Sequence, residues 1–568
     1  MASRDIADIL IIGSGASAGP FALHLSKVPG IRIVCLEQGD WVRPTQSLEE
    51  VRATAVGTHP ESAGQRRRLV TPTPRQNVRY FRNGYPYDYS ASYWQPILGN
   101  AVGGATLHYS AVWARLHPSD FRMRSLDGVG DDWPISYWDL APYYDRNDDT
   151  VGVAGIPGNP AYPPKSNTLL PPPKMNPAGQ ILGRGFDKLG WHWWPAERAI
   201  LTVPREGREA CTNDCASCSR GCPREAKNSS DVVFWPAAIR NGVVLKTNAR
   251  VREVTVNKRG LATGALYYDA EGRLHEQTAK IVVVACNGIG TPRLLLNSKS
   301  ARFPQGLANG NGQVGKNLMC HPLANVVGFF ETEAAPSGYG PGSDAGWGLG
   351  SDQFYESDPK RGFARGIWLL GGGSSGPVAA ALGERPLPIA TVVPPELQNS
   401  SGVRPVAWGA AHHKVLQEKY RQSISLSIMC DELPDEANRV ELDPSLTDDS
   451  GIPAPRLILK RSENTQKALA FGIERSKEAI LAAGATRIIT AEVTTAAPGH
   501  YLGTARMGTD PQRSVVDKWC RAHDVRNLFV IDGSVFTTAG SAAPTATIQA
   551  NALRVADYIK NNARTLLP

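Results

Sequence analysis

Four cysteines lie close together in residues 211–223, CTNDCASCSRGCP, of a 568-residue chain that has only nine cysteines. Their spacing is C-x3-C-x2-C-x3-C, and Pro223 follows the last of them. The bacterial ferredoxin pattern, C-x2-C-x2-C-x3-C-P, differs by one residue and supplies thiolates to iron–sulfur clusters. Four thiolates also suit zinc. The candidate metal ligands are therefore Cys211, Cys215, Cys218 and Cys222.

Disulfides or ordinary thiols are the alternatives to a metal in this segment, and disulfides persist mainly in oxidising compartments. The N-terminus lacks the positive region and cleavage site of a secretory signal, and Asp5 and Asp8 precede its first apolar run. Gly, Ser and Pro interrupt that run, so we expect no transmembrane helix. These features predict a cytoplasmic protein, in which closely spaced thiolates favour a metal. Export together with a partner would reopen the disulfide alternative.

A second candidate site lies at the N-terminus, where DILIIGSGASAGPFALHLSKVPGIRIVCLEQGD predicts a strand, a glycine-rich turn, a helix and another strand. Gly13 permits the tight turn, and Gly15 lets the backbone approach a pyrophosphate. Ala18 takes the position where a third glycine often allows close helix packing, and Glu37 can accept hydrogen bonds from a ribose. This βαβ unit predicts dinucleotide binding but does not choose between NAD and FAD.

The overall composition is that of an ordinary globular protein, with 42% hydrophobic and 20% charged residues. The formal net charge of +8 is spread along the chain, without the dense Lys/Arg runs that follow a phosphate backbone. We therefore expect no nucleic-acid binding.

Two later segments resemble further strands of the nucleotide-binding sheet. AKIVVVACNGIGTPRLLLNS predicts a buried strand, a glycine turn and a helix, and NLFVIDGSVFTT predicts a strand that ends at an Asp-Gly turn. Between them lie proline-rich connections and alternating strand patterns such as NRVELDP. The sequence therefore predicts an α/β domain assembled from separated segments and interleaved with an antiparallel-sheet domain.

Four segments together resemble the glucose-methanol-choline (GMC) oxidoreductases, which are FAD-dependent alcohol oxidases and dehydrogenases. They are GSGASAG…LEQGD, GNAVGGATLHYSAV, ACNGIGTPRLLLNS and the C-terminal GHYLGTARMGTDPQRSVVDKWCRAHDVRNLFVIDGSVF. Further segments, among them DDWPISYWDLAPYYDR and GWHWWPAERAI, are similar to the branch of gluconate, fructose and FAD-glucose dehydrogenases, pyranose oxidases and bacterial glycoside oxidases. The resemblance runs from about residue 6 to the end and selects FAD over NAD.

The resemblance implies a Rossmann-like FAD-binding domain interleaved with an antiparallel-sheet α+β substrate domain. We expect the discontinuous FAD-binding domain to comprise residues 1–45, 90–120, 205–325 and 495–568. We expect the substrate domain and its connecting or lid segments to comprise residues 46–89, 121–204 and 326–494.

The resemblance also implies a catalytic base, because the family's catalytic histidine stands in an H-x-x-G-T context. HYLGT places His500 there, and an imidazole titrates near neutral pH as a general base should. The family's second active-site residue is a His or Asn that precedes Pro-Thr before the last helix. Ala543 occupies that position here, ahead of Pro544 and Thr545, and an alanine side chain forms no hydrogen bonds.

This departure leaves several alternatives open. A neighbour such as Ser541 or Asn551 takes over, His500 works alone at a lower rate, or the substitution is engineered. A fourth alternative is another reaction: hydroxynitrile lyases share the fold and keep a flavin without its redox chemistry, and a degenerate flavoprotein would be a binding or assembly subunit.

The second flavin segment is VGGATLHYS, where Gly103 and Gly104 let the backbone approach the isoalloxazine. In pyranose and choline oxidases the histidine four residues after the second glycine is bonded covalently to the flavin. His108 occupies that position here, and a histidine merely packed against the flavin is the alternative.

Two more positions match flavin-contacting parts of the family. Asp532 and Gly533 in VIDGS match its flavin-contacting turn, and Val251 in RVREV matches its adenine-side strand. An Asp-Gly pair after a strand is also ordinary turn chemistry.

The resemblance therefore implies FAD-dependent oxidation of an alcohol group in a sugar, glycoside or aromatic alcohol, with hydride transfer to the flavin. The electrons then pass to O2, a quinone or a redox protein, and a small partner subunit is a further possibility. The related FAD-glucose and fructose dehydrogenases carry a three-iron cluster in a segment comparable to the four cysteines, so a cluster here would favour a dehydrogenase.

Overall fold

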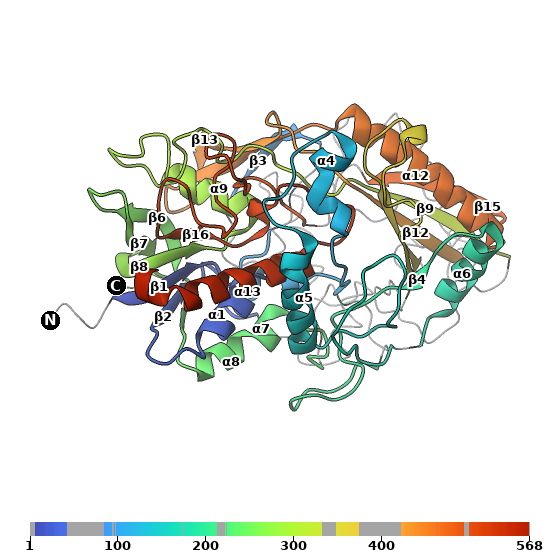
Figure 1. Cartoon of the computed structure of the whole chain (residues 1–568), viewed down its shortest axis with the longest axis horizontal. Coiled ribbons are helices and arrows are strands. Elements are labelled where there is room, and N and C mark those ends of the chain that lie inside the picture. Colours follow the sequence, from blue (N-terminus) through green and yellow to red (C-terminus); the bar gives the residue numbers. More distant parts are fainter. Residues whose placement is uncertain are drawn as a thin grey trace, which may run out of the picture.

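The computed structural model describes residues 6–42, 85–93, 96, 98–172, 174–212, 218, 222, 224–331, 348–373, 422–493 and 499–566. Two sheets dominate the molecule: a mixed, mainly parallel sheet in the left half of Figure 1 and an antiparallel sheet in the right half. Helices α4 (Met123–Asp127) and α5 (Tyr137–Val151) lie between them in this view.

The first sheet has seven strands, in the order β5-β2-β1-β8-β7-β6, with β16 also paired to β8. Its strands are β1 (Ala7–Ile12), β2 (Ile33–Leu36), β5 (Val244–Lys246), β6 (Arg250–Val256), β7 (Ala262–Tyr268), β8 (Leu274–Val284) and β16 (Leu528–Val530). β1, β2, β5, β16 and the end of β8 are parallel, whereas β7 pairs antiparallel with β6 and with the start of β8. Helices cover the parallel strands, which explains why these strands are almost continuously apolar.

The helices around this sheet come from distant parts of the chain. They are α1 (Ala18–Leu25), α7 (Ser230–Val233), α8 (Trp235–Arg240), α9 (Asn287–Asn297) and α13 (Thr545–Asn561), with α14 (Ala563–Leu566) at the end. α1 contacts both α13 and α8, and α13 also packs on α5. Helices from the beginning, the middle and the end of the sequence therefore pack against one another beside this sheet.

The second sheet has six antiparallel strands in the order β15-β9-β12-β11-β10-β4. They are β4 (Trp194–Pro195), β9 (Leu323–Phe329), β10 (Leu349–Ser351), β11 (Ile367–Gly373), β12 (Ser423–Cys430) and β15 (Arg487–Val493). Helices α6 (Pro177–Leu189) and α12 (Glu463–Ala482) pack on it and enclose a second apolar core. Alternating burial along β12 fits a sheet with two unlike faces.

A third, smaller sheet joins β13 (Arg439–Thr447), β14 (Pro453–Leu459) and β3 (Asp88–Ser92) and packs on α9. Short 3-10 helices η1 (Gly104–Leu107), η2 (Pro118–Arg122), η4 (Pro359–Arg361) and η6 (Gly533–Val535) connect the larger elements. The expected parallel α/β sheet and antiparallel sheet are both present, while the residue boundaries expected for the two domains stay a prediction.

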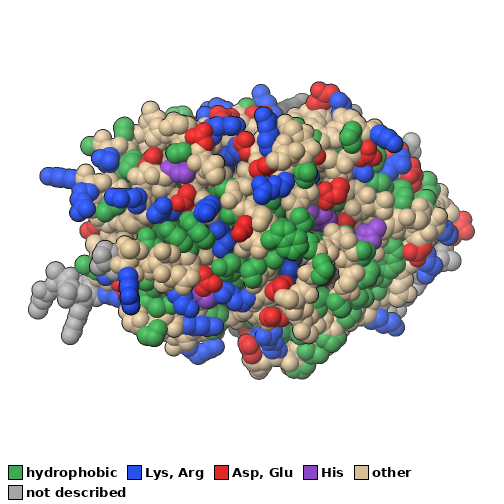
Figure 2. Space-filling view, in the orientation of Figure 1, with side chains coloured by type: hydrophobic (Ala, Val, Ile, Leu, Met, Phe, Trp, Pro, Cys, Tyr) green, Lys and Arg blue, Asp and Glu red, His purple; other side chains and the backbone are tan. Residues whose placement is uncertain are grey.

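On the face shown in Figure 2, Lys and Arg side chains are interspersed with Asp and Glu. In the described part of the chain, none of the helices combines the length and the apolar character that crossing a membrane requires.

Candidate active site and flavin cradle

The predicted dinucleotide turn has the geometry that its glycines were expected to provide. Gly13 has φ +92°, and a Cβ there would lie 2.5 Å from the carbonyl oxygen of Ala285. At Gly15 a Cβ would meet nothing within 4 Å, so open space borders the backbone where a pyrophosphate would approach. Ala18 is buried as the first residue of α1.

Glu37 directly follows the second strand of this unit and is almost fully buried. Its carboxylate accepts hydrogen bonds from the backbone N–H (2.9 Å) and hydroxyl (2.7 Å) of Ser14 and from the backbone N–H of Gly39 (2.8 Å). Burial raises the pKa of Glu37, while these hydrogen bonds lower it. The carboxylate is thus held at the turn, where the ribose is predicted to lie.

The second flavin segment lies directly against this turn. Gly103 donates its backbone N–H to Ser14 O at 3.1 Å, and a Cβ on Gly104 would lie 2.9 Å from the Gly15 Cα. Both glycines have positive φ, +94° and +54°, which disfavours other residues. One carboxylate oxygen of Asp231, packed beside Gly103, is buried without a hydrogen bond in the described structure.

The turn at Asp532 and Gly533 joins the same region. Asp532 accepts a hydrogen bond from the Thr291 hydroxyl at 2.6 Å and from the Ser534 backbone N–H at 2.8 Å. The Ser534 hydroxyl is buried and has no hydrogen-bond partner in the described structure. Open space at a glycine turn and unpartnered buried oxygens are what a bound flavin nucleotide would fill and satisfy, so the residues present fit FAD.

Val251 lies in β6, and the two residues that precede this strand run beside the end of β2. Asn248 donates its backbone N–H to Gly39 O (3.0 Å), and Ala249 donates to Glu37 O (2.8 Å). This places the start of β6 next to the predicted ribose site, on the side where the adenine is expected. An adenine contact by Val251 stays a prediction.

His500 stands next to His321, a residue that no sequence motif selected. Their Nδ1 atoms are 2.8 Å apart, and the rings meet edge to face with centroids 4.9 Å apart. His321 is fully buried, and its Nε2 is 2.7 Å from the carbonyl oxygen of Gly540. Burial lowers the pKa of His321 to about 4. Desolvation and the neighbouring His321 hold the pKa of His500 well below its usual value, so both rings are neutral at neutral pH.

The segment that carries His500 also contacts the predicted flavin turn. Gly503 donates its backbone N–H to Gly533 O at 3.2 Å, and a Cβ on Gly533 would lie 3.0 Å from Tyr501 O. The structure therefore brings the predicted base and the predicted flavin turn together from distinct motifs.

Ala543 is buried in the loop that precedes α13, three residues after Gly540. The two neighbours considered as replacements have other partners. Ser541 donates its hydroxyl to Gly366 O at 2.9 Å, and Asn551 donates to the Cys520 sulfur at 3.2 Å. A substrate contact by Ser541 stays a prediction, but its hydroxyl already supports the loop.

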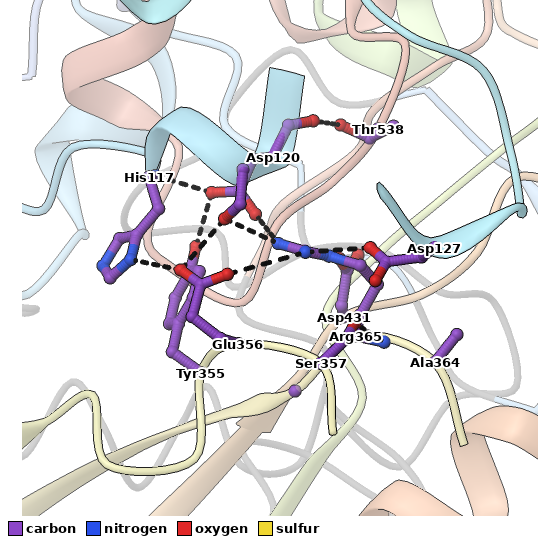
Figure 3. Close-up of polar contacts among 12 residues, drawn as sticks. His117, Asp120, Asp127, Tyr355, Glu356, Ser357, Ala364, Arg365, Asp431 and Thr538 are labelled. Carbon is purple, nitrogen blue, oxygen red and sulfur yellow. Dashed lines mark hydrogen bonds and ion pairs between the residues drawn. The ribbon is translucent and has the colours of Figure 1, made fainter. Parts of the chain in front are cut away.

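A buried charge cluster lies under this loop (Figure 3). Arg365 pairs with Asp120, with Asp127 at 3.1 Å and with Asp431 at 3.4 Å. Burial raises the pKa of Asp431 to about 7, although Arg365 opposes the shift. The cluster joins η2, α4 and the two strand ends beside Arg365 and Asp431, and therefore connects the antiparallel sheet to the active-site loop.

His108 follows η1 and belongs to the loop predicted to face the flavin. Desolvation and the nearby Lys227 ammonium lower the pKa of His108 to about 4. The buried Lys227 donates hydrogen bonds to Leu107 O (2.6 Å) and Cys218 O (2.9 Å). Lys227 therefore ties the cysteine segment to the predicted flavin loop.

Three of the four cysteines, Cys211, Cys218 and Cys222, lie in the described structure, whereas Cys215 lies outside the described residues. Within the described residues no group of three or more His, Cys, Asp or Glu side chains is arranged to hold a metal ion. These residues by themselves do not fit a cluster or zinc site, and the metal at the four cysteines stays a prediction.

Comparison with known proteins decides the family. Two models described as GMC oxidoreductase match residues 88–323 and 434–552. The chain belongs to the GMC oxidoreductase family. This GMC oxidoreductase is 40% identical to 2-methyl-1,2-propanediol dehydrogenase of Mycolicibacterium austroafricanum, over 98% of this chain and 96% of that protein. It is 29% identical to the fructose dehydrogenase large subunit of Gluconobacter japonicus, over 98% of both chains.

The same architecture occurs in the crystal structure of pyridoxine 4-oxidase from "Mesorbium loti", which has a TM-score of 0.63 and 16% identity. That match covers 98% of this chain and 99% of the other. The family and fold class predicted from the sequence are therefore confirmed. The GMC oxidoreductase described here is an FAD-dependent enzyme that acts on CH–OH groups.

His321 is the site residue that sequence reasoning missed. It lies in NLMCHPLANVV, 179 residues before His500, two residues before the start of β9. A histidine before an apolar strand has no spacing or motif that marks it as part of a site.

Proposed function

We propose that this GMC oxidoreductase oxidises a hydroxyl-bearing carbon of a small polyol, such as a vicinal diol or a sugar. The proposal is supported by the relatives, one named a 2-methyl-1,2-propanediol dehydrogenase and another a fructose dehydrogenase subunit. A glycoside or an aromatic alcohol remains within the same reaction type.

One observation carries the chemistry: His500, a neutral histidine, stands where its own segment contacts the predicted flavin turn at Gly533. A neutral imidazole can accept the proton of the substrate hydroxyl as the hydride leaves the carbon. His500 is the base in this proposal, and Ala543 supplies no second hydrogen bond.

We propose that the glycine turns described above, together with the residues beside them, hold FAD. Gly13 and Gly15 border the pyrophosphate, Glu37 binds the ribose, and Val251 lies on the adenine side. Gly103, Gly104, His108, Asp532 and Gly533 face the isoalloxazine. FAD, when bound, supplies the hydride acceptor, and the role of the protein is to position and desolvate the alcohol beside it.

We also propose that electrons leave to an acceptor other than O2, as the names of both dehydrogenase relatives suggest. The contact of Lys227 with Leu107 O and Cys218 O supports this, because it places part of the cysteine segment next to the predicted flavin loop. A metal at Cys211, Cys215, Cys218 and Cys222, and a small partner subunit, are parts of the proposal that need direct assays.

The first experiment is an anaerobic titration of the purified holoenzyme, followed by its flavin spectrum. The panel comprises 1,2-propanediol, 2-methyl-1,2-propanediol, fructose, a methyl glycoside and benzyl alcohol. Bleaching of the oxidised flavin by a diol or fructose, with recovery on adding a quinone faster than on adding air, is the expected result. A flavin that no alcohol reduces would overturn the proposal and make the lyase alternative the next one to test, with a cyanohydrin.

A further inference from the structure

The contact between His321 and His500 determines where the protons of both rings lie. The Nε2 of His321 lies 2.7 Å from the Gly540 carbonyl oxygen, and its Nδ1 lies 2.8 Å from the Nδ1 of His500. A carbonyl oxygen only accepts hydrogen bonds, so the Nε2 of His321 must carry the proton.

A neutral imidazole has one N–H, and therefore the Nδ1 of His321 is an acceptor. Full burial keeps His321 neutral at neutral pH, because it holds the pKa of the ring at about 4. The single proton between the two Nδ1 atoms then belongs to His500. His500 is consequently the tautomer with a protonated Nδ1 and a bare Nε2.

We propose that His321 is a positioning residue, which holds His500 in the tautomer whose bare Nε2 accepts the substrate proton. Within the described residues, His321 supplies the only polar side-chain contact of His500. With alanine at position 543, this contact is what selects both the orientation and the tautomer of the base. The inference rests on the proposed function only for its consequence in catalysis; the tautomer itself does not depend on the substrate.

The Gly540 carbonyl that orients His321 is itself held rigidly. Gly540 has φ +68°, and a Cβ there would lie 2.5 Å from Leu116 and 3.2 Å from Asp120. The next residue, Ser541, donates its backbone N–H to the Tyr355 hydroxyl at 3.1 Å, and Tyr355 donates to Asp120 at 2.8 Å. Arg365 pairs with Asp120 in the buried cluster of Figure 3.

A chain of contacts therefore fixes the orientation of His500. The Arg365–Asp120 ion pair holds the loop at Gly540 and Ser541 through Tyr355, the Gly540 carbonyl holds His321, and His321 holds His500. Each link is a hydrogen bond or ion pair in a water-poor region, where it is worth more than at the surface.

Two substitutions separate hydrogen bonding from mere filling of space. His321→Leu fills the space of the imidazole with an apolar side chain, which can neither donate nor accept a hydrogen bond. His321→Gln can donate its amide N–H to Gly540 O and accept from His500 Nδ1 through its amide oxygen. His523→Leu is the matched control, since the polar side-chain contact that the described structure gives His523 is with Ser514, at 2.9 Å, and not with either active-site histidine.

The kinetic test measures the rate constant of flavin reduction under argon with the best alcohol of the panel, in variants that retain FAD. We expect His321→Leu to lower this rate constant by about 10²–10⁴-fold, the usual contribution of a general base. We expect His321→Gln to stay within about tenfold of the wild type and His523→Leu to match it. The proposal would be overturned if His321→Leu reduced its flavin at the wild-type rate, or if His321→Gln lowered the rate constant as much as His321→Leu does.

A second measurement does not require a substrate. In holoenzyme labelled with ¹⁵N-histidine, His500→Gln and His321→Gln identify the signals of the two rings. We expect a protonated Nδ1 and a bare Nε2 for His500, and the opposite for His321. A protonated Nε2 on His500 would overturn the inference, whereas a wild-type flavin that no alcohol reduces, with these tautomers present, would overturn only the proposed function.

Discussion

The Tyr355 ring is stacked on the His117 imidazole, with ring centroids 3.8 Å apart and an angle of 14° between the planes. The Tyr355 hydroxyl also accepts the backbone N–H of Ser541. Tyr355 thereby joins the buried His117 to the loop whose Gly540 carbonyl orients His321. The stability of the charge cluster and the geometry of the active site are therefore expected to change together.

The stabilisation that His117 contributes is expected to depend on pH. Burial lowers the pKa of His117, but contacts with the Asp352 and Glu356 carboxylates at 3.3 and 3.0 Å outweigh it and raise that pKa to about 9. Because the folded pKa exceeds the unfolded value of about 6.5, the stabilisation is complete below about pH 6.5 and is lost as the pH rises through about 9. We expect the unfolding free energy of the wild type to exceed that of His117→Asn by less at about pH 9.5 than at about pH 6, with a change of up to ~3 kcal/mol. Urea denaturation of both holoenzymes measures it, and a pH-independent difference would contradict the assignment.

Replacing the proposed base should affect chemistry and not folding. We expect His500→Asn to reduce the rate constant of flavin reduction by about 10²–10⁴-fold, because no group then accepts the hydroxyl proton. The flavin content and melting temperature should stay near those of the wild type. Anaerobic stopped-flow spectroscopy measures the rate, and unimpaired reduction would show that another group is the base.

The alanine at position 543 predicts a difference between substrates. Ala543→Asn adds a hydrogen-bond donor near the predicted alcohol site, and such donors contribute about 10²–10³-fold to rates where they meet developing charge. We expect faster flavin reduction with an unbranched alcohol and a higher KM for 2-methyl-1,2-propanediol, since the larger side chain occupies space. Steady-state kinetics with both alcohols test this, and Ala543→Ser is a smaller polar control. Equal effects on the two alcohols would show that the residue at position 543 does not determine which substrate is preferred.

We predict that the flavin is bonded covalently to His108. Desolvation and Lys227 keep its imidazole neutral, and a neutral imidazole can act as a nucleophile toward the flavin. We expect acid-precipitated wild-type protein to retain its yellow flavin and acid-precipitated His108→Ala to release it. Release of free FAD by the wild type as well would mean that His108 only packs against the cofactor.

The cysteine segment predicts a metal content. If the four thiolates hold a cluster, anaerobically purified protein should contain about three or four iron atoms per chain with matching acid-labile sulfide. Cys218→Ser should lower the iron content and slow electron transfer to the acceptor while leaving flavin reduction by the alcohol unchanged. One zinc atom per chain without iron would indicate a structural site, and neither metal would remove the electron-exit role.

The sequence alone was sufficient for the features that depend on neighbouring residues. The glycine turn at Gly13, the two adjacent glycines at 103 and 104 and the buried parallel strands are local patterns, because backbone conformation and strand burial are set over a few residues. The family resemblance, carried by several such patterns in order, was enough to predict the fold class and the flavin cofactor.

Only the tertiary structure decided the environment of the base. His321 and His500 lie 179 residues apart and meet because the segment before β9 pairs with the segment after His500 through an antiparallel bridge between Met319 and Leu502. Arg365 and Asp120 look like ordinary solvated charges in sequence, but packing buries them together under Gly540. Which nitrogen of His500 carries a proton depends on these distant contacts, since a tautomer is selected by the partner that a fold places beside the ring.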